Sequence, residues 1–174
     1  MKICLVGPEM VPFAKTGGLG DVVGALPKAL GRLGHEVAVF VPLYREIDFG
    51  VHRVHAVDIN LAVPAGGHMQ SVSVRAVRQK KYNVDVYFVG NRQYFYRDGF
   101  YLDPVTGTDH DDNDERFEFF NRAVLELLKV VDFRPDIIHL HDWQSALIPV
   151  FLRTSYGAAP FFADTRTVLT IHNL

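Results

Sequence analysis

The chain has 174 residues, of which 48% are hydrophobic and 22% are charged, and its formal net charge is -2. This length suits one domain of about 100–200 residues, and the composition provides enough apolar material for a packed core. The scattered basic residues argue against a nucleic-acid-binding protein, which would carry a basic face. The single cysteine, Cys4, cannot form an intramolecular disulfide, which fits a reducing cytoplasm. The first apolar run stops at Gly7, too early for a signal peptide or a membrane span, so we expect no membrane association.

The first part of the chain predicts a strand, a helix and a second strand. Residues 3–6 form a continuous apolar run, which is typical of a strand buried in a parallel sheet. Apolar residues at helical spacing predict a helix over 20–33, with Gly34 as its C-terminal cap and a bend at Pro27. Residues 37–41 are again apolar, and the second strand is predicted over 36–41. This order indicates a βαβ unit.

The middle of the chain has a more antiparallel character. Residues 51–63 and 72–77 alternate between apolar and polar side chains, which predicts half-buried antiparallel strands. Residues 64–67 between them are rich in Pro and Gly and predict a turn. A further apolar strand is predicted over 84–89.

The last part of the chain returns to alternating helices and strands. Residues 103–114 are rich in Asp, Gly and Pro and predict a mobile loop, and helical spacing follows over 117–131. A strand is predicted over 136–140, a helix over 144–153 and a last strand over 167–171.

These elements predict an α/β fold with a mainly parallel sheet, helices on both faces and an antiparallel insertion. The sequence stops directly after a predicted strand, which a domain of this type would normally cover with another helix. We therefore expect the domain to be cut short.

The unusual polar clusters follow predicted strands. In open α/β sheets, ligands bind outside the carboxyl ends of the strands. Three clusters fall at such ends: residues 15–18, residues 139–143 and residues 172–173. Their equivalent positions predict one shared constellation.

The glycine-rich loop that contains Lys15, Gly17 and Gly18 has the residue types of a phosphate site. Backbone amides can approach a ligand closely there, Lys15 adds a positive charge, and the following helix contributes its dipole. The loop matches neither the dinucleotide fingerprint nor a P-loop. A tight turn with a surface lysine remains an equally open interpretation.

The second cluster favours sugar binding over metal binding. His139 and His141 would share one side of a strand, but the segment lacks the further ligands of common metal motifs. Asp142 and Trp143 offer a carboxylate and an aromatic face, which suit sugar hydroxyls and sugar rings. For His139 alone, a buried strand residue bonded to the backbone is the simpler interpretation. His172 on its own is compatible with a histidine satisfied at a strand end.

Taken together, several segments resemble the family of bacterial glycogen synthases and plant starch synthases. The match runs through the whole chain in register and also accounts for Pro27. The matching segments are Lys-Thr-Gly-Gly-Leu-Gly-Asp-Val at 15–22, Ala-Leu-Pro-Lys-Ala-Leu at 25–30, Gly-His-Glu-Val at 34–37, Pro-Leu-Tyr at 42–44, Asp-Glu-Arg-Phe at 114–117, 135–143, and Thr-Ile-His-Asn-Leu at 170–174.

The resemblance implies a Rossmann-like N-terminal lobe of a two-domain glycosyltransferase of the GT-B type. Such enzymes transfer glucose from ADP-glucose to the non-reducing end of an α-1,4-glucan with retention, without a metal or other cofactor. Residues 1–174 would be the N-terminal catalytic-type domain, truncated and without the second lobe. The fragment alone would be inactive.

The resemblance also implies roles for individual residues. Lys15 and the amide of Gly18 would contact the donor diphosphate. Asp142 and His172 would contact the transferred glucose, with His172 beside the reacting carbon. The acceptor or the cleft is assigned to Asp21, Tyr96 and Asn173.

Two alternatives remain open from the sequence. One is another retaining sugar-nucleotide transferase, such as a sucrose-synthase-like enzyme that uses UDP-glucose. The other is a non-catalytic module that binds glycan or nucleotide. The sequence indicates no oligomeric state.

Overall fold

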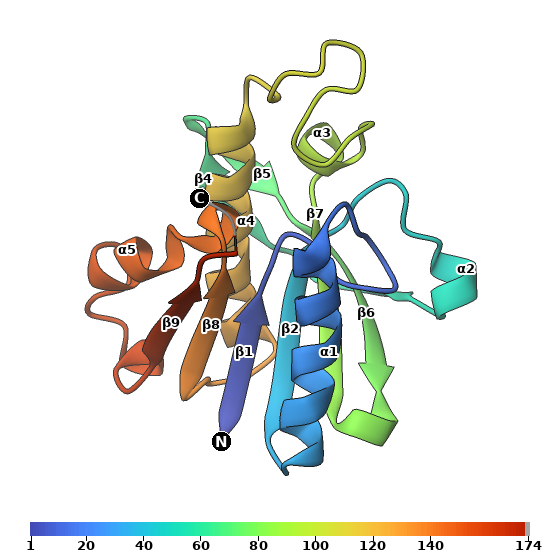
Figure 1. The fold of residues 1–174 in the computed structure, drawn as a ribbon. Coiled ribbons are helices and arrows are strands. Elements are labelled where there is room, and N and C mark those ends of the chain that lie inside the picture. Colours follow the sequence, from blue (N-terminus) through green and yellow to red (C-terminus); the bar gives the residue numbers. More distant parts are fainter. Residues whose placement is uncertain (173–174) are drawn as a thin grey trace.

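A mixed seven-stranded sheet forms the centre of the protein in the computed structural model, which describes residues 1–172 (Figure 1). The strand order is β3-β6-β7-β2-β1-β8-β9; neighbours from β7 to β9 are parallel, whereas β6 and β3 pair antiparallel at one edge. The strands are β1 (Lys2–Val6), β2 (Glu36–Pro42), β3 (His55–Val57), β6 (Ser73–Gln79), β7 (Val84–Gly90), β8 (Ile137–His141) and β9 (Arg166–Thr170).

β1 and β2 lie where the continuous apolar runs predict them, and β7, β8 and β9 lie within two residues of their predicted ranges. β1 is central, because Leu5 pairs with Val39 of β2 on one side and with His139 of β8 on the other. Its side chains from Ile3 to Val6 are buried, and the Cys4 thiol is fully enclosed, which raises its pKa. The predicted α/β class with a mainly parallel sheet is therefore confirmed.

Helices cover both faces of the sheet, as predicted. α1 (Gly18–Arg32) packs over β2 and β7, and α4 (Asn113–Val130) lies on the opposite face, where it contacts α5 (Ile148–Arg153) (Figure 1). α1 continues through Pro27, and Gly34 follows its end with a φ of 88°. A positive φ at this position is typical of a C-terminal glycine cap.

The backbone of α1 lies close to two other segments. A Cβ atom on Gly24 would lie 2.7 Å from the carbonyl oxygen of Val11. A Cβ atom on Gly31 would overlap the carbonyl oxygen of Tyr82, the last residue of the short helix η1 (Lys80–Tyr82). Only glycine permits such an approach, so these contacts fix the position of α1 against the sheet.

The prediction of one long strand over residues 51–63 is wrong. Residues 49–52 instead form a helical turn, α2 (Phe49–His52), because Asp48 caps it with an oxygen 2.9 Å from the backbone nitrogen of Val51. Only β3 remains of the predicted strand inside the sheet.

A separate hairpin replaces the rest of that strand and the predicted turn. β4 (Ala62–Ala65) pairs antiparallel with β5 (His68–Ser71), outside the main sheet. Gly66 and Gly67 adopt positive φ angles between the two strands, so the turn is shorter than predicted. The hairpin contacts α4 through β4.

Three helices differ from their predicted bounds, the first being α1, which spans Gly18–Arg32 instead of 20–33. α4 begins at Asn113 instead of residue 117. The predicted helix over 144–153 is divided into a short helix η2 (Trp143–Ser145) and α5, which places Pro149 in its first turn. Proline is tolerated there because its missing N–H would have no partner in the helix. The remaining short helices are α3 (Arg92–Phe95) and η3 (Pro160–Phe162). Among the helices of residues 1–172, none has the length and apolar character needed to cross a membrane.

Candidate functional site

A cavity of about 800 Å³ lies at the carboxyl ends of β1, β8 and β9. The chain builds the sheet outward from β1 through β2 to β7 and then returns to the other side of β1 with β8 and β9. Such a reversal of strand order is the usual ligand position in open α/β sheets. The cavity is lined by Glu9, Thr16, Gly17, Gly18, Leu19, Val22, Tyr101, Asp142, Trp143, Gln144 and His172.

The glycine loop forms one wall of this cavity. Gly17 is the N-cap of α1 and provides no side-chain hydrogen bond to the first turn. Amides in the first turn of a helix have no partner within the helix, so those that begin at Gly18 can donate to an anion. The wall thus has the geometry of an anion site at a helix N-terminus.

Lys15 and Asp21 form an ion pair beside this wall. The Nζ atom of Lys15 lies 2.6 Å from Oδ2 of Asp21, and the two side chains are 47% and 57% exposed. Exposed pairs contribute little free energy, so the lysine can exchange this partner for another anion at small cost. Neither residue is among those that line the cavity.

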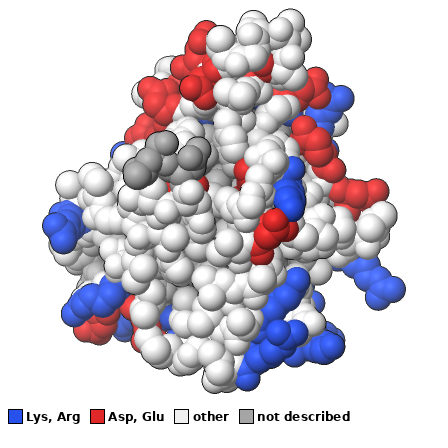
Figure 2. All heavy atoms as spheres, viewed as in Figure 1, with Lys and Arg blue, Asp and Glu red and all other residues white. Residues whose placement is uncertain are grey.

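The surface charge around the site is not generally positive. On the face drawn in Figure 2, acidic side chains gather toward the end of the molecule where α4 begins, and basic ones gather over the far end of α1. Binding of an anion in the cavity would therefore depend on local donors and not on a broad positive field.

The buried side chain of Glu9 holds the glycine loop in place through hydrogen bonds. This side chain is 3% exposed, and its carboxylate accepts hydrogen bonds from the backbone of Thr16 at 2.7 Å and of Gly17 at 3.2 Å. It also accepts from the hydroxyls of Thr16 and Tyr101. Glu9 was not predicted from the sequence; the available signal was a lone carboxylate among apolar residues between β1 and the glycine loop.

Asp142 has an unusual backbone conformation, with φ 58° and ψ -176°. Residues other than glycine rarely occupy this region, and it is found mainly where neighbouring structure enforces it. The enforcing contacts come from β9 and η2: the Asp142 amide donates to the carbonyl of Thr170 at 3.0 Å, and its own carbonyl accepts from Ser145. This backbone conformation places Asp142 in the lining of the cavity, at the end of β8.

His172 is bonded to two residues of the β8 end. Its backbone N–H donates to Oδ1 of Asp142 at 2.6 Å, and its Nε2 atom lies 2.9 Å from Nδ1 of His141. The His141 and His172 rings are stacked with centroids 5.2 Å apart. Asp142 and His141 together fix both the backbone and the ring of His172.

The histidine behind the site is neutral. His141 is fully buried, and burial together with the nearby His139 and His172 lowers its pKa to about 3. His139 is half-buried, and burial and then His172 also lower its pKa. A neutral His141 ring can hold a neighbouring side chain by a hydrogen bond without adding charge to the cavity.

His139 and His141 share one side of β8, with ring centroids 4.4 Å apart. Nε2 of His139 lies 2.7 Å from the hydroxyl of Thr170, and Nδ1 of His141 faces His172. The expected backbone partner of His139 is thus a side-chain hydroxyl instead. Each of these two nitrogens has a protein partner, which suits positioning.

The remaining predicted residues are placed differently. Trp143 is 52% exposed, lines the cavity and packs edge-on against Phe117. Tyr96 does not line this cavity and belongs to a second one near β6. Asn173 lies outside the described residues.

Comparison with known proteins shows which family the chain resembles. A family model described as the starch synthase catalytic domain matches residues 2–174. Glycogen synthase 2 of Geobacter metallireducens is 49% identical over 174 residues, covering 100% of this chain and 35% of that protein. A glycogen synthase of Geotalea uraniireducens is 45% identical with the same coverage. The chain thus spans about a third of the length of these relatives.

A solved structure agrees with the family match. The catalytic domain of starch synthase IV from Arabidopsis thaliana, bound to ADP and acarbose, superposes with a TM-score of 0.84 at 32% identity. The superposition covers 99% of this chain and 34% of that one.

Proposed function

From the premise that the chain belongs to the starch synthase catalytic domain family, we propose that it forms one wall of the donor site of a glucosyltransferase. The proposed reaction transfers glucose from ADP-glucose to the non-reducing end of an α-1,4-glucan with retention of configuration. The similar starch synthase was solved with ADP and acarbose, which supports a nucleotide and a glucan as ligands here.

One observation carries the proposal: the first turn of α1, Asp142 and His172 line the same cavity. A sugar nucleotide has a diphosphate and a neutral sugar, and this cavity offers a different set of groups to each. The amide of Gly18 at the helix N-terminus suits the diphosphate. Lys15, released from Asp21, would add the positive charge that offsets it. We propose that protein groups alone bind the diphosphate, without a metal or other cofactor.

Asp142 suits the sugar end of the donor. Its Oδ1 atom is occupied by the N–H of His172, which leaves Oδ2 to accept a sugar hydroxyl. As the bond to the diphosphate weakens, positive charge develops on the sugar ring, and a fixed carboxylate stabilises that charge. His172 lies next to Asp142 and would contact the same sugar near its reacting carbon.

The chain would act within a longer protein. It spans 35% of the matched relatives, and the remaining protein would provide the opposite wall of the cleft. We therefore propose that the 174-residue chain alone does not turn over ADP-glucose. The single buried thiol, Cys4, suits a reducing compartment such as the cytoplasm.

The test is incorporation of labelled glucose into an α-1,4-glucan primer by the longer protein that contains this chain. ADP-glucose should be the preferred donor, and His172→Ala should lower turnover strongly with little change in unfolding temperature. Preference for UDP-glucose would favour a sucrose-synthase-like enzyme. Binding of glucan or nucleotide without any transfer would favour a non-catalytic module and reject the proposal.

A further inference from the structure

The side-chain amide of Gln144 is buried without a hydrogen-bond partner among residues 1–172. Gln144 lies in η2 and lines the donor cavity, although it is only 5% exposed. Its Oε1 atom is enclosed and unpartnered, and none of the hydrogen bonds within residues 1–172 involves its Nε2 atom. Such an amide costs free energy, because it gives up its hydrogen bonds to water and gains none from the protein. Buried polar groups of this kind are rare in native proteins, and functional sites are one place where they occur.

The backbone of Gln144 is, in contrast, firmly held. Nδ2 of Asn121 donates to the carbonyl of Gln144 at 2.7 Å and to that of Phe117 at 2.6 Å. The Oδ1 atom of Asn121 accepts from the N–H of Ile148 at 3.1 Å. Asn121 is also fully buried, so its amide bonds to three backbone groups while the amide of Gln144 bonds to none. The fold therefore fixes the position of Gln144 through its backbone and leaves the side-chain amide to a ligand.

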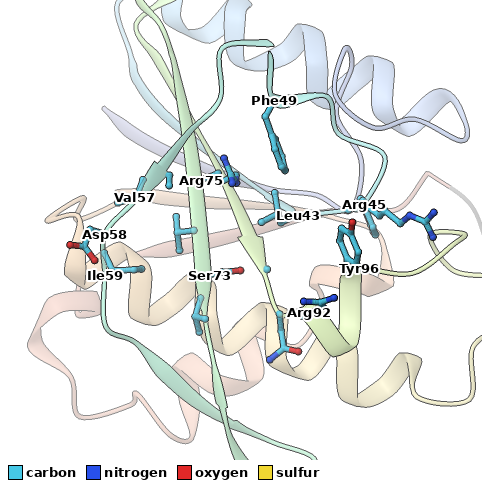
Figure 3. A pocket seen from close by; sticks show the side chains of 16 residues that line it. Leu43, Arg45, Phe49, Val57, Asp58, Ile59, Ser73, Arg75, Arg92 and Tyr96 are labelled. Carbon is cyan, nitrogen blue, oxygen red and sulfur yellow. The ribbon is translucent and has the colours of Figure 1, made fainter. Parts of the chain in front are cut away.

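An asparagine in a second cavity shows how the protein satisfies a similar group. That cavity, of about 550 Å³, lies beside β6 and shares no lining residue with the donor cavity (Figure 3). Asn91 lines it; its Oδ1 atom accepts from the N–H of Gln93 at 2.9 Å, and its Nδ2 atom donates to the carbonyl of Ser71 at 3.1 Å. A place in a cavity lining thus does not by itself leave an amide unpartnered.

The position of Gln144 indicates the sugar end of the donor. Asp142, Trp143 and Gln144 follow β8 directly and all line the cavity, whereas the amides that suit the diphosphate belong to the first turn of α1. A sugar hydroxyl both donates and accepts, so it can pair with either atom of an amide. A diphosphate oxygen only accepts and would leave Oε1 unpartnered. The last torsion of a glutamine side chain is broad, so either atom can turn toward the cavity.

We propose that the side-chain amide of Gln144 binds a hydroxyl of the transferred glucose and so contributes to the selection of the sugar. This role rests on the proposed function, because it needs a sugar nucleotide in the donor cavity. Gln144 acts as a binding residue beside Asp142 and takes no part in proton transfer. Its hydrogen bond forms only with the ligand, which accounts for the unpartnered amide in the free protein.

Steady-state kinetics of the longer protein that contains this chain test the role, with Gln144→Met as the variant. Methionine has a similar length but lacks the amide, so kcat/KM for ADP-glucose should fall by about tenfold. ADP lacks the sugar, and its inhibition constant should therefore stay unchanged. The unfolding temperature should stay the same or rise, because the variant removes a buried amide that has no partner in the protein.

Gln79→Met is the matched control. Gln79 ends β6, and its Oε1 atom is also enclosed without a partner, but it lines neither the donor cavity nor the cavity beside β6. This variant should leave both kcat/KM and the inhibition constant of ADP unchanged. Gln144→Leu repeats the measurement with a second apolar side chain, which covers the case that methionine packs poorly.

The outcomes separate this role from the proposed function. If the parent protein transfers glucose and both Gln144 variants do so equally well, Gln144 does not bind the sugar and the proposed function stands. Tenfold weaker inhibition by ADP would assign the amide to the diphosphate and overturn the sugar contact. A marked fall in unfolding temperature in both variants would show that the amide is structural. Absence of transfer by the parent protein would reject the proposed function and this role with it.

Discussion

The carboxylate of Glu9 accepts a hydrogen bond from the backbone N–H of Thr16 at 2.7 Å, although the two residues lie on opposite sides of the loop turn before α1. The same carboxylate accepts from Gly17 and Tyr101. A buried negative charge thus organises the loop that we propose binds a second negative group. Glu9 takes up the amides before the helix and leaves the amides from Gly18 onward for a ligand.

Replacing Glu9 by glutamine should destabilise the protein by about 1–3 kcal/mol, because an NH₂ group would then face hydrogen-bond donors. Urea unfolding gives this free energy. Amide hydrogen exchange should also become faster at Thr16 and Gly17. Glu46→Gln is the control, since Glu46 is exposed, and it should change the free energy of unfolding by less than about 0.5 kcal/mol. Equal stability of the two variants would contradict the role of Glu9.

The low pKa of His141 predicts a pH dependence of stability. Burial, followed by His139 and His172, lowers this pKa to about 3, whereas a histidine in the unfolded chain titrates near 6.5. The unfolded state therefore binds more protons between these values, so stability is greatest above pH 6.5 and falls as the pH decreases toward 3. One such group contributes a slope of at most about 1.4 kcal/mol per pH unit.

His141→Asn removes this group but keeps an atom that can bond to His172. Between pH 4.5 and 6, its unfolding free energy should vary less steeply with pH than that of the parent chain (an interval chosen inside the titration window). His68→Asn, at an exposed position in β5, should retain the parent slope. Parallel curves for the parent chain and His141→Asn would show that His141 is not held neutral by the fold.

The backbone strain at Asp142 can be measured with two variants. Asp142→Gly and Asp142→Ala both lose the carboxylate that bonds to His172, but only glycine adopts φ 58° and ψ -176° at no steric cost. The glycine variant should therefore be more stable than the alanine variant by about 1–3 kcal/mol.

Asp85, inside β7, is the control position, where the glycine variant should be less stable than the alanine variant. Glycine in a strand interior costs about 0.5–1 kcal/mol relative to alanine, so Asp85→Gly should be the less stable of that pair. If glycine were also the less stable substitution at position 142, the conformation of Asp142 would not be strained.

Lys15→Ala should raise the donor Michaelis constant of the longer protein by about tenfold or more, because a charge-assisted contact to the diphosphate is lost. Its unfolding free energy should barely change, since the ion pair with Asp21 is exposed. Steady-state kinetics with varied ADP-glucose measure the first effect. Lys28→Ala, on α1, should leave the Michaelis constant unchanged. An unchanged constant in Lys15→Ala would contradict a role of Lys15 in donor binding.

β1 and β2 could be predicted because they are almost wholly buried and read as nearly unbroken apolar runs. The region after Phe49 could not, because its alternation suits both a sheet strand and a hairpin that packs on α4. Which of the two forms depends on the Asp48 cap and on pairing between residues 62–65 and 68–71. Period-two patterns define a face but not the partner strand.

The site was predictable where short segments carry the chemistry. The glycine loop, Asp142 and His172 follow strands, and the sheet order brings them to one cavity. Glu9 was missed because its partners lie across the loop and on Tyr101, far along the chain. The position of Tyr96 in another cavity likewise depends on how α3 leaves the sheet after β7.

The close approach of α1 to Val11 and Tyr82 limits which sequences can share this fold. Even a methyl group at Gly24 or Gly31 would push the helix away from the sheet and displace its first turn, which faces the cavity. In a library of all single substitutions, these two positions should tolerate almost no replacement, whereas the exposed Ala25 and Ala29 on the same helix should tolerate many. The freedom of the sequence to vary is therefore restricted at positions outside the site by the need to hold one helix end in place.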